Sequence, residues 1–238
     1  MNTVLITGGS RGIGAEMVRR FSFGGYRVAF IYHQSHEAAK TVARATGAYP
    51  ICADISVPLE VKRAVSEAKE QLGHIDVLIN NAAVAGFRLF TDIEDEEWAR
   101  FIGVNLNGAF YASRAVLSDM IGRKSGAIIN VSSMWGQVGA SCEVHYSAAK
   151  AGLIGLTKAL AKEVGPSGIR VNCIAPGVID TEMNAALSEK DRHALIEETP
   201  LMRLGTVADV AEAAFFLAGE GASFITGQIL GVNGGFII

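Results

Sequence analysis

The sequence predicts an α/β fold: one parallel, doubly wound sheet with helices on both faces. Three observations lead to this prediction. The chain has 238 residues, 50% of them hydrophobic, and 27 glycines, which suits one large domain with a buried sheet and many tight turns. Short β-branched runs alternate with longer amphipathic segments, as in repeated βα units. Each connection is long enough for a right-handed crossover. We therefore expect a single domain over residues 1–238, with about seven strands.

The strands are expected where short β-branched runs occur, and the helices in the longer amphipathic segments between them. The expected strands are Thr3–Thr7, Arg27–Tyr32, Tyr49–Ala53, Val77–Asn80, Ala127–Val131, Arg170–Ile174 and Ile229–Val232. The expected helices are Gly12–Phe23, Ser35–Thr46, Leu59–Leu72, Glu94–Ile121, Tyr146–Val164 and Val207–Ala218. The sequence contains no linker and no repeat of fixed period, which also favours one domain.

Composition and charge argue against several classes of protein. The net charge is −3 and the basic residues are scattered, so the basic stripe of a nucleic-acid-binding protein is missing. The three cysteines, Cys52, Cys142 and Cys173, have no metal-ligand spacing, and no metal is expected. No apolar run approaches the roughly 20 residues that cross a bilayer. We expect a cytoplasmic protein that binds neither membrane nor nucleic acid.

A glycine-rich turn follows the first expected strand. Residues 7–14 read TGGSRGIG and lead directly into a helix. Glycines allow close approach of the backbone, and the helix start offers free N–H groups and the positive end of a dipole. A dinucleotide pyrophosphate satisfies those donors, as in Rossmann-type folds. The residues expected to bind it are Gly8, Gly9, Ser10, Arg11, Gly12, Ile13 and Gly14.

Tyr146 and Lys150 are candidates for proton transfer. They lie four residues apart, on one face of an expected helix that follows a strand and the pair Ser132-Ser133. Reduction of a carbonyl requires a hydride on carbon and a proton on oxygen. A nearby cation stabilises phenolate, and lowering the tyrosine pKa by ~3 units takes ~4 kcal/mol. Lys150 is expected to supply this positive charge. Both Lys150 and Tyr146 are expected to contact the cofactor.

Together these motifs resemble the short-chain dehydrogenase/reductase family, over essentially the whole chain. Asp54-Ile55 resembles the family's adenine-contacting pair, and residues 80–83 (NNAA) resemble its NNAG motif, with Ala83 in place of glycine. Residues 225–228 (ITGQ) and 232–235 (VNGG) resemble the C-terminal signature. Residues 176–181 (PGVIDT) resemble the segment that covers the nicotinamide and its phosphates. The further cofactor contacts implied are Asp54, Ile55, Asn81, Ala82, Pro176, Gly177, Ile179 and Thr181.

The resemblance also assigns roles beside Tyr146. Ser133, thirteen residues before it, is selected over Ser132 to orient the substrate oxygen. Asn105 matches the asparagine that anchors a water in the family's proton relay, with Asn107 as the nearby alternative.

NADP(H) is expected rather than NAD(H). An acid at the end of the second strand would bind a ribose 2′-hydroxyl and repel a 2′-phosphate. Here that end reads FIYHQS over residues 30–35, with no acid before Glu37. Arg11 is placed to pair with the additional phosphate, and His33 is a further candidate contact.

Among its relatives, the chain most resembles bacterial 3-oxoacyl-[acyl-carrier-protein] reductases. The likeness lies in its length, its glycine turn and the run AGLIGLTKALAKEVGPSGIRVN over residues 151–172. Lys124 suits docking of the acidic carrier protein, whereas Ser167 stands where a basic residue is frequent.

Other substrates and a non-catalytic role stay open. Residues 134–145, which include Trp135, Glu143 and His145, are expected to line the pocket. This loop resembles that of reductases that act on an aminopentanone modification of a lysine of elongation factor P, and Glu143 is then a candidate partner of the substrate amine. A small ketone, sugar or alcohol is a third reading. A dinucleotide-sensing regulator would be expected to lose Tyr146 or Lys150.

Residues 181–205 interrupt the βα rhythm and are helix-prone over 184–198. Because they follow a strand end that carries Pro176-Gly177, we expect a substrate lid there. The resemblance further implies a homotetramer in which the two longest expected helices, 94–121 and 146–164, pair between subunits.

Overall fold

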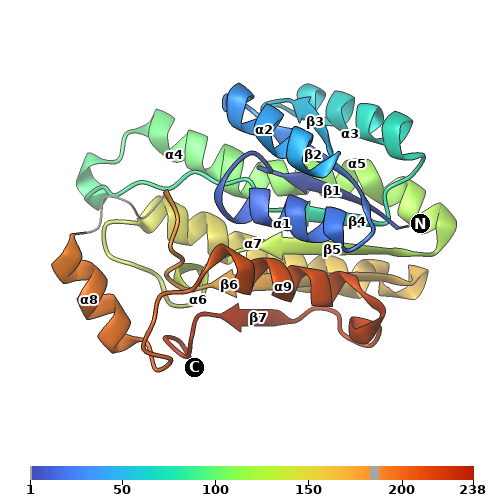
Figure 1. Ribbon diagram of the computed structural model, residues 1–238. Helices are drawn as coiled ribbons and strands as arrows, with labels where there is room; N and C mark the ends of the chain where they lie inside the picture. Colours follow the sequence, from blue (N-terminus) through green and yellow to red (C-terminus); the bar gives the residue numbers. More distant parts are fainter. Residues whose placement is uncertain (1, 183–187) are drawn as a thin grey trace.

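A computed structural model describes residues 2–182 and 188–238 of the chain. It contains one sheet of seven parallel strands in the order β3-β2-β1-β4-β5-β6-β7 (Figure 1). The predicted doubly wound, Rossmann-type α/β class is therefore confirmed. The strands are β1 (Thr3–Thr7), β2 (Arg27–Tyr32), β3 (Tyr49–Cys52), β4 (Val77–Asn80), β5 (Gly126–Val131), β6 (Ile169–Pro176) and β7 (Ile229–Val232).

Helices cover both faces of the sheet. One apolar cluster joins the sheet to α1, α2 and α9, and a second joins it to α3, α5 and α7. Shorter helices lie at one edge of the sheet, where the arrowheads of β5 and β7 point (Figure 1). The helices are α1 (Gly12–Phe23), α2 (His36–Thr46), α3 (Pro58–Leu72), α4 (Asp95–Ile102), α5 (Gly108–Arg123), α6 (Trp135–Val138), α7 (Val144–Val164), α8 (Glu189–Glu198) and α9 (Val207–Ala218).

The central strands are buried on both faces, which explains their continuous apolar runs. All five residues of β1 are buried. Leu5 belongs to the cluster beneath α3 and α5, and the adjacent Ile6 belongs to the cluster beneath α1 and α9. Leu5 pairs in register with Ala29 of β2 and Leu78 of β4. Strand order reverses beside β1, so the carboxyl ends of β1 and β4 form the switch point at which doubly wound sheets bind ligands.

The prediction of one unbroken helix over 94–121 is wrong in the middle of that range. Between α4 and α5 the chain forms a π-helical turn, η2 (Gly103–Asn107). Such a turn accommodates an additional residue and is frequent at functional sites. It holds Asn105, whose side chain is buried and bonded to the backbone of Val84. The periodicity of apolar residues in the sequence could not predict this turn, because the turn accompanies a contact between Asn105 and Val84 that arises only in the folded chain.

Other elements differ from expectation in small ways. Strand β6 runs two residues beyond Ile174, because residues up to Pro176 pair with β7. The pocket loop 134–145 contains the short helix α6 and the start of α7.

The insertion 181–205 begins and ends at one point of the sheet edge. Ile179 and Gly205 form an isolated parallel bridge, in which Asp180 N donates to Gly205 O at 2.8 Å. Arg192 of α8 binds both carboxylate oxygens of Asp180, at 3.0 and 2.8 Å. The helix expected over 184–198 is present over Glu189–Glu198, and residues 183–187 lie outside the described residues. Within the described ranges, no helix is both long and apolar enough to span a membrane.

Candidate active site

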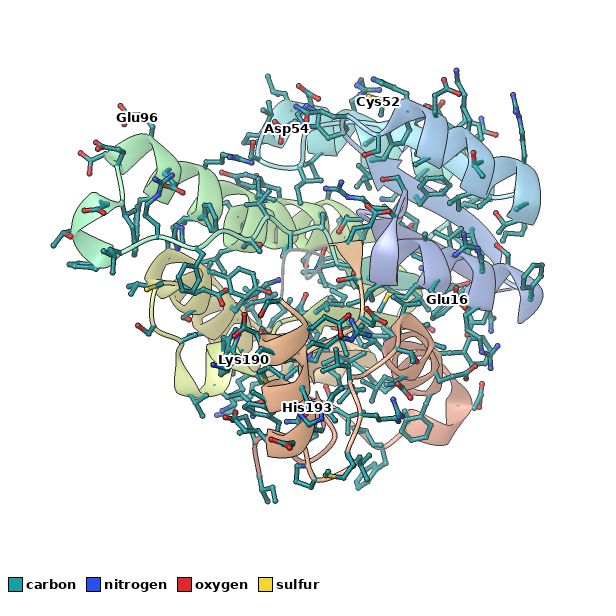
Figure 2. The ribbon with its side chains drawn as sticks, turned by 60° about the vertical axis from the view of Figure 1, so that its left-hand side comes forward. Glu16, Cys52, Asp54, Glu96, Lys190 and His193 are labelled. Atoms are coloured by element: carbon teal, nitrogen blue, oxygen red, sulfur yellow. The ribbon has the colours of Figure 1, made fainter. Side chains whose placement is uncertain are left out.

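The predicted site residues lie at the carboxyl edge of the sheet. Figure 2 labels Glu96 on α4 and Lys190 and His193 on α8, the helices that flank this edge. The same view labels Cys52 and Asp54 at the end of β3.

The glycine turn is built by close backbone contacts. Gly8 has φ +70°, and a Cβ there would lie 2.7 Å from Ala82 Cα. A Cβ on Gly14 would overlap the carbonyl oxygen of Gly8. The N–H groups of Gly8 and Gly9 donate to Ile31 O at 2.8 and 3.1 Å, which ties the turn to β2. These positions therefore require glycine for the shape of the turn itself.

Thr7 and Asn81 fasten the ends of β1 and β4 together. Asn81 Nδ2 donates to Thr7 O at 3.0 Å and to Gly8 O at 3.2 Å. The N–H groups of Asn81 and Ala82 both donate to Thr7 Oγ1 at 3.0 Å. The side-chain amide of Asn81 is thus engaged in holding the glycine turn.

The start of α1 fits a bound dinucleotide phosphate. Arg11 occupies the N-cap with extended backbone, and its side chain makes no cap hydrogen bond within the described residues. Gly12 has φ +53°, and within the described residues a Cβ there would meet only Thr181 Cγ2, at 3.9 Å. The first turn of a helix has free N–H groups, and the space left at Gly12 suits the close approach of a pyrophosphate. Pro176, Gly177 and Ile179 lead to Thr181 along the end of β6.

The side of the site next to β2 and β3 carries mixed charge. Asp54 accepts hydrogen bonds from Ser56 N and Oγ at 2.8 and 2.7 Å, and its carboxylate lies 3.9 Å from His33 Nε2. Partial burial raises the pKa of Asp54, but the hydrogen bonds from Ser56 and the nearby His33 together lower it by more. The pKa therefore lies below its usual range. The side chain of Arg11 is 67% exposed and lies 4.0 Å from Glu182. Ile55 is buried beneath Gly108.

Tyr146 and Lys150 are both buried at the start of α7. Lys150 Nζ lies 5.6 Å from the centroid of the Tyr146 ring. Burial raises the pKa of Tyr146 to about 12, the Ser133 side chain acts against this through a hydrogen bond, and Glu143 adds to it. Burial also lowers the pKa of Lys150 to about 8. The phenol is therefore held in its protonated form, which is the form that a proton donor requires.

The two neighbouring serines have different surroundings. Ser132 Oγ donates to the backbone oxygen of Lys150 at 2.8 Å, so this hydroxyl fastens β5 to α7. Ser133 Oγ accepts from Trp135 N at 3.1 Å and is also within hydrogen-bonding reach of Tyr146. Ser133 is thus the serine that the fold brings to the phenol.

Asn105 lies against the segment that follows β4. Its Nδ2 donates to Val84 O at 3.0 Å, and its Oδ1 accepts from Val84 N at 3.2 Å. The oxygen and the nitrogen of the Asn105 side-chain amide both form hydrogen bonds with the backbone of Val84. Asn105 therefore fixes the chain just beyond Asn81 and Ala82.

The pocket loop brings further side chains to the site. Trp135 contacts Phe236 edge to face, with ring centroids 6.0 Å apart. Glu143 is half-buried, burial raises its pKa, and it has no ion pair within the described part of the chain. His145 is fully buried and stacks on Phe101 of α4. No motif in the sequence marks Phe101 or Phe236, because their contacts depend on how distant elements pack.

The chain matches one family model and several known proteins over nearly its whole length. Residues 8–237 match the family model described as Enoyl-(Acyl carrier protein) reductase. The chain is 41% identical to the 3-oxoacyl-[acyl-carrier-protein] reductase of Chlamydia trachomatis, over 98% of this chain and 96% of the relative. It is 40% identical to the enzyme of the same name from Staphylococcus aureus, over 98% and 97%. The relative from Chlamydia muridarum is 42% identical, over 97% and 95%.

Proposed function

This chain belongs to the short-chain dehydrogenase/reductase family, and on that premise we propose that it is an NADPH-dependent 3-oxoacyl-[acyl-carrier-protein] reductase. It is an oxidoreductase of C=O and CH–OH groups that uses a nicotinamide dinucleotide. One observation carries the proposal: Tyr146, Ser133 and Lys150 are buried together where β5 leads into α7, in a fold whose first helix begins at a glycine turn suited to a pyrophosphate. A regulator that only senses dinucleotide has no need of this set.

In the proposed reaction, Ser133 and Tyr146 hydrogen-bond the ketone oxygen. A nicotinamide dinucleotide held by the glycine turn and residues 176–181 would supply the hydride for the carbonyl carbon. Ser133 then stabilises the charge that develops on oxygen, and Tyr146 transfers its phenolic proton there. Lys150 lies 5.6 Å from the phenol ring centroid and limits the cost of the phenolate that remains.

The preference for NADPH rests on the charges near the end of β2. Arg11 is an exposed guanidinium whose nearest acid, Glu182, is 4.0 Å away in a weak exposed pair. A ribose 2′-phosphate is a stronger partner for it. The other dinucleotide contacts in this proposal are the glycine turn, His33, Asp54, Ile55, Asn81, Ala82 and residues 176–181.

Turnover of acetoacetyl-[acyl carrier protein], followed at the nicotinamide absorbance with NADPH and NADH in parallel, tests the proposal. We expect rapid oxidation of NADPH, slow oxidation of NADH, and a loss of at least 100-fold in Tyr146→Phe. Tight NADPH binding without turnover of this substrate would reject the carrier-bound oxoacyl group and keep the reductase assignment. Equal use of NADH would reject the role of Arg11.

A second substrate is favoured by Glu143. This carboxylate lies close enough to Tyr146 to raise its pKa, yet it pairs with no cation in the described residues. A ketone that carries an ammonium group, such as an aminopentanone on a protein lysine, would supply the missing charge. We expect Glu143→Gln to lower kcat/KM at least tenfold for 5-amino-2-pentanone and less than threefold for an acetoacetyl thioester. Equal losses on both substrates would reject this candidate.

Assembly and a substrate lid complete the proposal. Trp98 and Phe110 are 40% and 42% exposed on α4 and α5, which suits the pairing of these helices and α7 between subunits of a homotetramer. A stable monomer in analytical ultracentrifugation would reject the tetramer. Lys124, at the end of α5, is the proposed contact for carrier protein. Residues 181–205 are proposed as the lid over the substrate.

A further inference from the structure

His145 is a fully buried histidine that immediately precedes Tyr146 in the first turn of α7. Neither of its ring nitrogens has a hydrogen-bond partner within residues 2–182 and 188–238. Each unpaired buried polar group costs about 1–3 kcal/mol, and such groups in a native structure call for an explanation.

Two side chains of α4, one helical turn apart, contact the imidazole. Phe101 stacks on its face, with ring centroids 3.7 Å apart and an interplanar angle of 16°. Glu97 approaches its edge, where Oε1 lies 3.7 Å from His145 Nε2. This separation is a few tenths of an ångström beyond a hydrogen bond. The stacking therefore holds the ring at the correct place to donate to Glu97 after a small movement of α4.

Glu97 also joins α4 to both loops that border the site. Its Oε2 lies 3.2 Å from Arg88 Nε, in the segment that follows β4. The backbone N–H of Arg88 donates in turn to Cys142 O at 2.7 Å, in the loop that leads to Tyr146. One carboxylate is thus placed to connect α4, both loops and the first turn of α7.

We propose that His145 is a positioning residue, which donates a hydrogen bond from Nε2 to Glu97. This bond clamps the start of α7 against α4. The clamp holds the phenol of Tyr146 in line with the substrate oxygen. The catalytic consequence rests on the proposed reductase function. The clamp itself does not, because it joins residues of this chain alone. Within the described residues, the charged group recorded at the ring is Glu97 on α4, which is itself paired with Arg88 after β4.

Variants separate the hydrogen bond from the stacking and from the Arg88 pair. His145→Phe retains an aromatic face against Phe101 and removes the donor. Glu97→Met removes the acceptor, whereas Glu97→Gln retains one. Arg88→Gln, the matched control, removes only the second ion pair of Glu97. All are measured as NADPH-loaded protein with saturating acetoacetyl thioester.

We expect H145F and E97M each to lower kcat about tenfold, and to leave the Kd for NADPH within twofold and the melting temperature within a few degrees. The double variant should be no slower than the slower single variant, because both remove one interaction. E97Q should recover most of the activity, and R88Q should retain it. Additive losses, full activity in E97M, or losses that follow the Kd for NADPH would overturn the proposal.

A readout without substrate keeps the two proposals distinguishable. We expect the Nε2 proton of His145 in imidazole ¹⁵N–¹H spectra of the NADPH complex to be protected and shifted downfield, and E97M to abolish this signature. A spectrum unchanged by E97M would overturn the clamp even if turnover is normal. A wild-type protein that shows the signature but reduces no ketone would reject the proposed function and leave the clamp intact.

Discussion

Lys150 on α7 donates a 2.8 Å hydrogen bond from Nζ to the carbonyl oxygen of Val131 on β5. This bond holds the buried ammonium at the strand that leads to Ser132 and Ser133, 5.6 Å from the centroid of the Tyr146 ring. Burial lowers the pKa of Lys150 to about 8 and raises that of Tyr146 to about 12. The protein without cofactor therefore keeps a protonated acid beside a cation that it holds at an energetic cost.

That cost predicts a stabilising substitution. The pKa of Lys150 is about 8 in the folded protein and 10.5 at its ordinary value, so between these the unfolded chain binds more protons. The penalty is complete below about pH 8 and disappears as the pH rises to about 10.5. Lys150→Met removes the charge and the bond to Val131, and should raise the free energy of unfolding at pH 7 by about 2 kcal/mol. Because the substitution also loses the bond to Val131, the advantage should vanish at about pH 9.5 and be reversed by about pH 10.5.

Urea unfolding of both proteins without NADPH, from pH 7 to pH 10.5, measures this difference. A K150M protein that is less stable by the same amount at every pH would show that burial imposes no penalty on the ammonium and that only the bond to Val131 contributes.

Asn105 gives a second prediction, for stability. Replacing it with alanine leaves the partly buried N–H and C=O groups of Val84 without their partner. Each hydrogen bond contributes about 0.5–1.5 kcal/mol, so Asn105→Ala should lower the free energy of unfolding by about 1–3 kcal/mol. Asn107→Ala, in the same π turn, is the control and should cost less than 1 kcal/mol. Equal losses would mean that the turn, and not the pair with Val84, is what matters.

The same residue shows where sequence reasoning succeeds and fails. The sheet, its parallel strands and the glycine turn were predictable, because β-branched runs, amphipathic segments and glycine spacing are local signals. The position of Tyr146 and Lys150 on one helix face followed from the helical period. The π turn at Asn105 and the contact of His145 with Phe101 and Glu97 arise from packing of elements distant in sequence, and no local pattern encodes them.

Arg11 provides a third prediction, for cofactor selectivity. If its guanidinium binds the 2′-phosphate, Arg11→Gln removes a charge-assisted interaction of about 1.5–3 kcal/mol. The KM for NADPH should rise about 10- to 100-fold, while the KM for NADH should change less than threefold. Arg19→Gln, which alters an exposed arginine of the same helix paired with Glu16, is the control and should change neither value. Parallel loss of both cofactors would place Arg11 at the pyrophosphate instead.

Gly14 gives the last prediction, because its neighbours are the backbone of Gly8 and the hydrogen-bonded side-chain amide of Asn81, neither of which can move aside freely. A Cβ at Gly14 would overlap the Gly8 carbonyl oxygen and lie 2.5 Å from Asn81 Nδ2. Gly14→Ala must therefore open the glycine turn and strain the bonds of Asn81 to Thr7 and Gly8. Strain of this kind costs about 1–3 kcal/mol. We expect the Kd for NADPH to rise at least tenfold and the melting temperature to fall.

Gly155→Ala, on α7, is the matched control, because within the described residues its added Cβ would meet no atom within 4 Å outside the adjacent backbone of its own helix. It should raise stability by up to about 1 kcal/mol, since alanine favours a helix interior over glycine. Calorimetric titration with NADPH and thermal unfolding measure both variants, and unchanged affinity in G14A would show that the turn does not bind the dinucleotide.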